Sequence, residues 1–273
     1  MSIRPGGPVL LAGAGKMGGA MLERWVAIGL DPSLVFVQDP APSPKISGLA
    51  RASGFAVSAA PKLPSAPSVI VLATKPQVFD QVLPGLARLR GGDTVVLSIA
   101  AGRTIASMQK HFGADAAIVR AMPNLPASIG EGITGACASA GVTPAQAERC
   151  AALLSAVGQV AWVKDEALID AVTAVSGSGP AYVFLLTECM AQAGVEAGLD
   201  AELAMQLARA TVCGAGSLMR ASPEDAAALR RNVTSPGGTT AAALEVLMGS
   251  PGLQEMMTRA IAAAAKRAKA LSA

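Results

Sequence analysis

The chain has 273 residues, of which 52% are hydrophobic, 15% are charged and 3% are aromatic. This composition excludes intrinsic disorder, and the length favours two domains over one. The formal net charge of +3 is spread along the chain without a long basic run, so we expect no nucleic-acid partner and no membrane partner.

Apolar runs alternate with amphipathic stretches through the first 120 residues. Such runs are typical of parallel strands buried on both faces. A helix is expected from about residue 18 to residue 28, and another near 46–53. The expected strands cover residues 9–12, 35–37, 69–73, 94–98 and 117–120. This order predicts an α/β fold with a Rossmann-type, doubly wound, mostly parallel sheet.

From Glu166 onward the pattern changes to apolar residues at helical spacing, and no further strand is expected. Helices are expected near 166–175, 180–197, 201–221, 223–231, 239–248 and 252–270. We therefore expect a dinucleotide-binding Rossmann domain over residues 1–165 and an all-helical dimerisation and substrate-binding domain over residues 166–273. The many small residues of these helices allow close packing and indicate that a partner subunit shares the core.

The cysteine and histidine content limits the chemistry. The four cysteines are far apart and form no CxxC pair, so we expect small buried side chains in a reducing compartment: Cys137, Cys150, Cys189 and Cys213. The single histidine, His111, is expected near a helix end and argues against a metal site and against a histidine-based triad. No signal peptide or membrane span is evident near the N-terminus, and we expect a cytoplasmic protein.

A glycine-rich motif, Gly13-Ala14-Gly15-Lys16-Met17-Gly18, follows the first expected strand and opens the first helix. Glycines let backbone amides approach a pyrophosphate, and the helix N-terminus supplies partial positive charge. Asp39, at the end of the second expected strand, is placed to hold the ribose hydroxyl groups of a nucleotide. The alternative interpretation is a structural glycine turn.

Two further loops follow expected strands at the edge where open α/β sheets bind ligands. They are Ala73-Thr74-Lys75-Pro76 and the stretch that contains Ile99-Ala100-Ala101, whose small residues leave room for a flat ring. The alternative interpretation of Lys75 is a solvated charge on a loop. The loop at 120–126 is interpreted as turn-rich rather than catalytic.

Residues 232–240 open the helix expected at 239–248. We expect free backbone amides at Gly237, Gly238, Thr239 and Thr240 to form, with nearby hydroxyl groups, a small-anion site that suits a carboxylate. A plain helix cap is the alternative interpretation.

Six segments resemble, in the right order, the pyrroline-5-carboxylate reductase family: GAGKMG, ATKPQ, SIAAG, RAMPNLPASIGEG, DAVTAVSGSGPAY and NVTSPGGTTAAAL. The resemblance covers nearly the full chain, and the last two segments are highly specific. It implies an oxidoreductase that reduces 1-pyrroline-5-carboxylate, a small-molecule substrate, to L-proline with NADPH or NADH, the last step of proline biosynthesis. It also implies an interlocked homodimer, and dimers of this family often assemble into decamers.

The resemblance also assigns roles to particular residues. Thr240 is implied as the catalytic hydroxyl at the ring nitrogen. Substrate contacts are implied at Glu166, Thr173, Ser235, Gly238, Thr239 and Thr240. Together with Asp39, cofactor contacts are implied at Gly13, Ala14, Gly15, Lys16, Met17, Gly18, Ala73, Thr74, Lys75, Pro76, Ile99, Ala100, Ala101 and Asn232.

Some positions depart from the family pattern. Thr74 and Leu125 replace the usual Val and Thr, and residues 58–61 lack the Asn that many members place near the adenosine. Two alternatives stay open: an NAD-dependent 3-hydroxyacid dehydrogenase and a non-catalytic nucleotide-sensing dimer. The first requires a catalytic Lys after a glycine-rich stretch, and no Lys follows Gly179 until Lys266.

Overall fold

The computed structural model describes residues 3–272 and divides into two compact units. The first unit comprises the described residues up to Gly177 and those from Ala265 onward, and the second unit comprises Ser178–Ala264. These units are defined by contacts within one chain, so the expected boundary between residues 165 and 166 stays a prediction.

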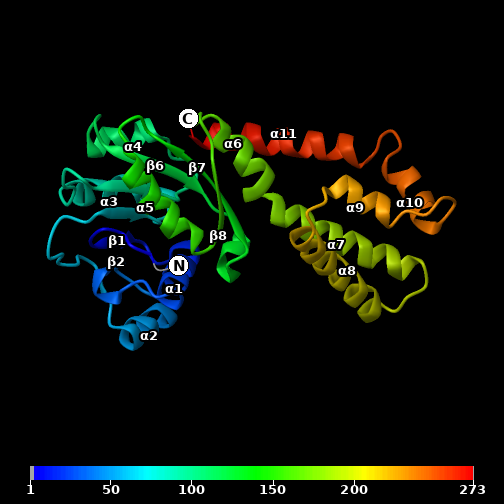
Figure 1. Ribbon diagram of the computed structural model, residues 1–273, viewed down its shortest axis with the longest axis horizontal. Coiled ribbons are helices and arrows are strands. Elements are labelled where there is room, and N and C mark those ends of the chain that lie inside the picture. Colours follow the sequence, from blue (N-terminus) through cyan, green and yellow to red (C-terminus); the bar gives the residue numbers. More distant parts are fainter. Residues whose placement is uncertain (1–2, 273) are drawn as a thin grey trace. The chain divides into compact units, whose positions relative to one another are not determined.

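The first unit is built on one eight-stranded sheet with the order β3-β2-β1-β4-β5-β6-β7-β8 (Figure 1). Neighbouring strands run parallel except for β6 and β7, which are antiparallel. The expected doubly wound, mostly parallel sheet is confirmed. The strands are β1 Val9–Ala12, β2 Val35–Gln38, β3 Ala56–Ser58, β4 Val69–Leu72, β5 Val95–Ser98, β6 Ala117–Met122, β7 Gly132–Ala138 and β8 Gly158–Trp162.

Helices cover both faces of this sheet. Alternate residues of β1 point to opposite faces, so Val9 and Leu11 pack in one core with α1, α2 and α5, while Leu10 packs in the other with α3, α4 and α6. Burial on both faces explains why the strands are continuous apolar runs. These helices are α1 Lys16–Ala27, α2 Pro44–Ser53, α3 Phe79–Ala87, α4 Ile105–Phe112, α5 Pro144–Ser155 and α6 Leu168–Val172, and short helical turns lie at η1 Pro32–Leu34, η2 Pro76–Val78, η3 Leu125–Ile129 and η4 Thr173–Gly177.

Three strands were not anticipated from the sequence. β3 has only three residues and lies at the sheet edge, and β7 is rich in Gly and Ala, which have low strand propensity. β8 pairs with β7 and is mostly exposed, so it lacks the apolar run of a buried strand.

The second unit is helical, as expected, and α7 and α8 lie side by side in it (Figure 1). Gly194 of α7 lies close to Ala204 of α8, because a Cβ built on Gly194 would be 3.3 Å from the Ala204 Cβ. In the described part of this unit, the buried hydrophobic side chains are those of Ala191, Ala204 and Ala208. The helices are α7 Gly179–Glu196, α8 Ala201–Ala221, α9 Ala226–Asn232, α10 Thr239–Leu247 and α11 Leu253–Ser272, whose last residues from Ala265 belong to the first unit.

The cysteines divide between the two units. Cys137 and Cys150 are buried in the first unit, and burial raises the pKa of the Cys150 thiol to about 12. The expectation of buried side chains is wrong for Cys189 and Cys213, which are exposed on α7 and α8. They are exposed because the helices of the second unit leave large apolar faces uncovered within a single chain.

One helical stretch, Leu168–Glu196, is long and apolar enough to cross a membrane by length and composition alone. Only 11% of its most apolar window is buried within the chain. Several large apolar side chains of α7 are therefore exposed: Val183, Phe184, Leu185, Leu186 and Met190.

Candidate functional site

The glycine-rich motif forms a tight turn between β1 and α1. Gly13 has a φ of +92°, and a Cβ at this position would be 2.8 Å from the Ala73 carbonyl oxygen. A Cβ on Gly18 would collide with the Gly13 carbonyl oxygen. By contrast, a Cβ on Gly15 would meet nothing within 4 Å. Gly13 and Gly18 are thus needed for packing, whereas Gly15 leaves the space in front of the helix open.

The N-terminus of α1 faces this open space. Its N-cap residue is Gly15, and no side chain caps the helix. The first amides of a helix have no partner within the helix and attract anions. A cavity of about 370 Å³ adjoins the turn and is lined by Gly15, Lys16, Glu23, Ser43 and Lys45 among others. The turn, the uncapped helix and the cavity fit the pyrophosphate of a dinucleotide.

Backbone hydrogen bonds hold three loops together at the carboxyl ends of neighbouring strands. The Gly13 amide donates to Gln38 (2.9 Å), that of Ala73 to Ala12 (2.8 Å) and that of Ile99 to Leu72 (3.0 Å). The structure thus brings together the predicted cofactor segments 13–18, 73–76 and 99–101. Pro76 begins η2, and its side chain lies outside the described part of the structure.

Asp39 follows β2 and is held against the glycine-rich turn. Its Oδ2 accepts a hydrogen bond from the Ala14 amide (2.9 Å), and its Oδ1 accepts one from the Ala41 amide (2.9 Å). The carboxylate therefore fixes the turn in place while keeping its charge at the end of β2, where Asp39 was predicted to act.

Glu166 is part of a partly buried ion-pair network in the first unit. Its Oε1 accepts hydrogen bonds from the Ile105 amide at the start of α4 (2.8 Å) and from Arg120 Nη1 (2.8 Å). Arg120 Nη2 donates to Ser272 Oγ (3.2 Å) and lies 3.8 Å from Asp170 Oδ1. The Arg120 side chain is only 6% exposed. The network joins β6, α4, α6 and the end of α11.

Sequence reasoning did not identify Arg120 and Asp170 as members of this network. Arg120 lies within strand β6, and a charged residue in a buried strand needs a partner, which was the available signal. Asp170 Oδ1 is buried and accepts no hydrogen bond from residues 3–272. Thr173, which was predicted to contact substrate, donates its hydroxyl to the Ile169 carbonyl oxygen (2.7 Å).

The segment before α10 forms a turn in the second unit. Gly237 has a φ of +69°, which favours glycine. The Gly238 amide was expected to be free, but it donates to the Ser235 carbonyl oxygen (3.1 Å), because the chain must turn there before the helix. Gly238 is the N-cap of α10, no side chain caps this helix, and Thr239 and Thr240 are its first two residues. The predicted anion site therefore rests on the first amides of α10 and excludes that of Gly238.

Asn232, a predicted cofactor contact, ends α9 and is exposed. Its Nδ2 donates to Glu224 Oε2 (2.9 Å). Asn232 belongs to the second unit, as does Thr240, the predicted catalytic residue, whereas the other predicted cofactor residues belong to the first.

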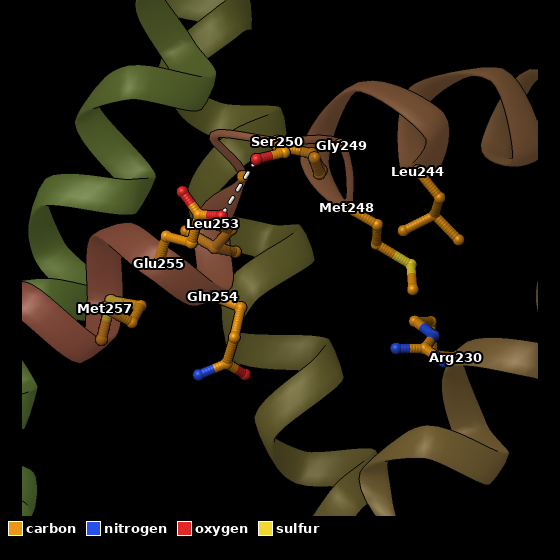
Figure 2. Close-up of a pocket in the computed structure, with 11 residues that line it drawn as sticks. Arg230, Leu244, Met248, Gly249, Ser250, Leu253, Gln254, Glu255 and Met257 are labelled. Carbon is orange, nitrogen blue, oxygen red and sulfur yellow. Dashed lines mark hydrogen bonds between the residues drawn. The ribbon is translucent and has the colours of Figure 1, made fainter.

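A second cavity, of about 670 Å³, lies in the second unit and contains none of the predicted site residues (Figure 2). Apolar side chains dominate its wall, including Leu244, Met248 and Leu253. Ser250 Oγ donates to Glu255 Oε1 (3.0 Å) beside it. Within residues 3–272, no group of three or more His, Cys, Asp and Glu side chains is placed to hold a metal ion.

Comparisons with known proteins match both halves of the chain. The family model for pyrroline-5-carboxylate reductase dimerisation matches residues 166–271. A second model, described as NADP oxidoreductase coenzyme F420-dependent, matches residues 9–102. The two matches fall on the expected helical region and on the glycine-rich half of the expected Rossmann region.

Relatives match over nearly the full length. A pyrroline-5-carboxylate reductase from Pseudomonas aeruginosa is 38% identical over 97% of this chain and 96% of its own length. One from Pisum sativum is 34% identical over 95% of this chain and 94% of its own.

Solved structures agree in fold. The pyrroline-5-carboxylate reductase of Coxiella burnetii, 34% identical, superposes with a TM-score of 0.92 over 98% of this chain and 99% of its own. The Plasmodium falciparum pyrroline carboxylate reductase, solved with NADP bound, is 26% identical, with a TM-score of 0.78 over 97% of this chain and 98% of its own. Because both parts of the chain and nearly its full length are matched, the protein is an NAD(P)H-dependent oxidoreductase that belongs to the pyrroline-5-carboxylate reductase family.

Proposed function

We propose that this chain reduces the C=N bond of 1-pyrroline-5-carboxylate to give L-proline, in the cytoplasm, with NADH or NADPH as the hydride donor. The observation that carries this proposal is the start of α10, where a Gly237-Gly238 turn leads into a helix that has no side-chain cap. Such a helix start can bind an anion, and it lies in one of the two segments that are highly specific to the family.

The cofactor residues are those of the first unit that face the carboxyl ends of β1, β2, β4 and β5, together with Asn232. The amides at the start of α1 would hold the pyrophosphate, and the open space at Gly15 admits it. The small side chains of Ala100 and Ala101 leave room for the nicotinamide ring. When bound, the dinucleotide supplies the hydride.

Thr240 and its neighbours are the proposed substrate residues. Ser235 and the amides of Thr239 and Thr240 hold the substrate carboxylate, and the Thr240 hydroxyl hydrogen-bonds the ring nitrogen. An iminium carbon is already electrophilic, so the reaction needs no protein nucleophile. Gly238 contributes by its lack of a side chain, because a Cβ there would be 2.5 Å from Ser235 Oγ.

Glu166 and Thr173 fit a positioning role in this proposal. The Glu166 carboxylate already binds the start of α4 and Arg120, and Thr173 binds its own helix. Both residues lie close to Ala100 and Ala101. Thr173 lines a small cavity together with these two alanines and Arg120, and Glu166 accepts a hydrogen bond from Arg120.

The proposed assembly is an interlocked homodimer, which in this family extends to decamers. The dimerisation match covers α7, whose large apolar side chains are exposed within one chain. A second copy covers such a face as well as a lipid bilayer would, and the family match favours the second copy over a membrane.

Oxidation of NADH or NADPH after addition of 1-pyrroline-5-carboxylate, followed at the nicotinamide absorbance, tests the activity. We expect oxidation that depends on both enzyme and substrate. NAD-dependent oxidation of a 3-hydroxyacid would instead support the dehydrogenase alternative. A folded protein that binds a dinucleotide but oxidises neither cofactor with this substrate would contradict the proposal and favour a nucleotide sensor.

A further inference from the structure

The adenosine end of the proposed cofactor site has few free hydrogen-bond donors. The loop that follows β2 reads Asp39-Pro40-Ala41-Pro42-Ser43-Pro44, and its three prolines have no amide hydrogen. The Ala41 amide is already bound to Asp39 Oδ1 (2.9 Å). Ser43 Oγ accepts a hydrogen bond from the Ile46 amide (3.3 Å) as the cap of α2, which leaves its hydroxyl hydrogen as the one side-chain donor of this loop.

A ribose diol and a ribose 2′-phosphate need opposite partners. The diol offers two hydroxyl hydrogens and needs acceptors, whereas a phosphate is an acceptor that carries close to two negative charges. Asp39 has a free lone pair on each carboxylate oxygen after its bonds to Ala14 and Ala41, so it can still accept from a diol. The same fixed carboxylate repels a phosphate.

The cations around this end are partly neutralised. Lys45 Nζ lies 2.7 Å from Glu23 Oε1 and 2.9 Å from Glu23 Oε2. Lys16 and Lys45 carry two positive charges in the cavity next to the glycine-rich turn, and Glu23 and Asp39 carry two negative charges beside them. The local charge is therefore balanced before a phosphate arrives, and the loop residues 40–44 include no cation that could offset the charge of Asp39.

We infer that this adenosine end selects an unphosphorylated ribose, so that the enzyme prefers NADH to NADPH, with Asp39 as the main determinant and the Glu23–Lys45 pair as a secondary one. The inference rests on the proposed cofactor site and adds to it the identity of the dinucleotide. Lys45 is 74% exposed, and exposed ion pairs are weak, so the contribution of Glu23 is the smaller of the two.

Isothermal titration calorimetry of the full chain with NADH and with NADPH, without substrate, measures this selectivity directly. For the unmodified chain we expect NADH to bind about tenfold more tightly than NADPH, since the 2′-phosphate meets the Asp39 charge. Asp39→Ser should lower the ratio of the two affinities by about tenfold, and Glu23→Gln, which frees Lys45, by about twofold to threefold.

Asp31→Ser is the matched control. It removes the same charge from the opposite end of β2, where Asp31 caps η1, and should leave the ratio unchanged. Equal or tighter binding of NADPH to the unmodified chain, or an unchanged ratio in Asp39→Ser, would overturn the inference while leaving the cofactor site intact. Failure to bind either dinucleotide would overturn the cofactor site together with the inference.

Discussion

The two units use apolar residues in different ways. The first unit buries large side chains such as Trp25, Phe79 and Leu97 on both faces of its sheet. In the described part of the second unit, the buried hydrophobic residues are all alanines. Phe184 and Leu186 are 53% and 47% exposed. The first unit therefore has a hydrophobic core of its own, whereas the second needs a further surface to cover its helices.

The starts of the helices show a related difference. In α4, α5, α8 and α9 a Thr or Asp side chain caps the first turn. In α1 and α10 the N-cap is glycine, without a capping side chain. Capped ends serve stability, and glycine-led ends leave amides available for an anion. These two helix starts, one in each unit, are the ones for which we propose a ligand.

The largest expected effect concerns the core of the first unit. Arg120→Leu should destabilise the chain by about 3 kcal/mol, because it leaves Glu166 and Asp170 without their cation in a largely buried setting. Chemical denaturation at a fixed protein concentration measures the change.

Arg103→Leu is the control for this experiment. It removes an ion pair with Asp80, which is 61% exposed, and should cost less than about 1 kcal/mol. If the two variants lose equal stability, the buried network does not support the first unit.

A smaller effect is expected at the start of α10. Thr240→Val keeps the side-chain shape but removes the hydroxyl group, so turnover should fall by about 10- to 100-fold, or roughly 1.4–2.7 kcal/mol of transition-state stabilisation. Steady-state kinetics, with calorimetry of NADH binding as the control, separates this loss from a change in cofactor affinity. Full turnover in a folded variant would remove Thr240 from the mechanism.

Patterns that depend on local chemistry could be predicted, and those that depend on partners far along the chain could not. Strand β1 and the turn at Gly13 were predictable because a buried run followed by glycines has few other solutions. Strand β7 was missed because its Gly and Ala residues gain strand structure only by pairing with β6 and β8.

The site shows the same limit. The glycine-led starts of α1 and α10 could be read from the sequence. Pairing of Arg120 with Glu166 joins residues 46 positions apart, and the turn that consumes the Gly238 amide depends on backbone angles. Neither the ion pair nor the turn can be predicted from the spacing of residues in the sequence.

The central claim is that a second copy of the chain covers the apolar helices of the second unit, and sedimentation velocity of the full chain at micromolar concentration tests it most directly. We predict a dimer or a larger assembly, and a shift towards monomer in Leu186→Asp, because a charge on a covered face costs several kcal/mol, whereas on an exposed face it costs about 0.5 kcal/mol or less. A folded monomer of the unmodified chain, with native circular dichroism, would contradict the account.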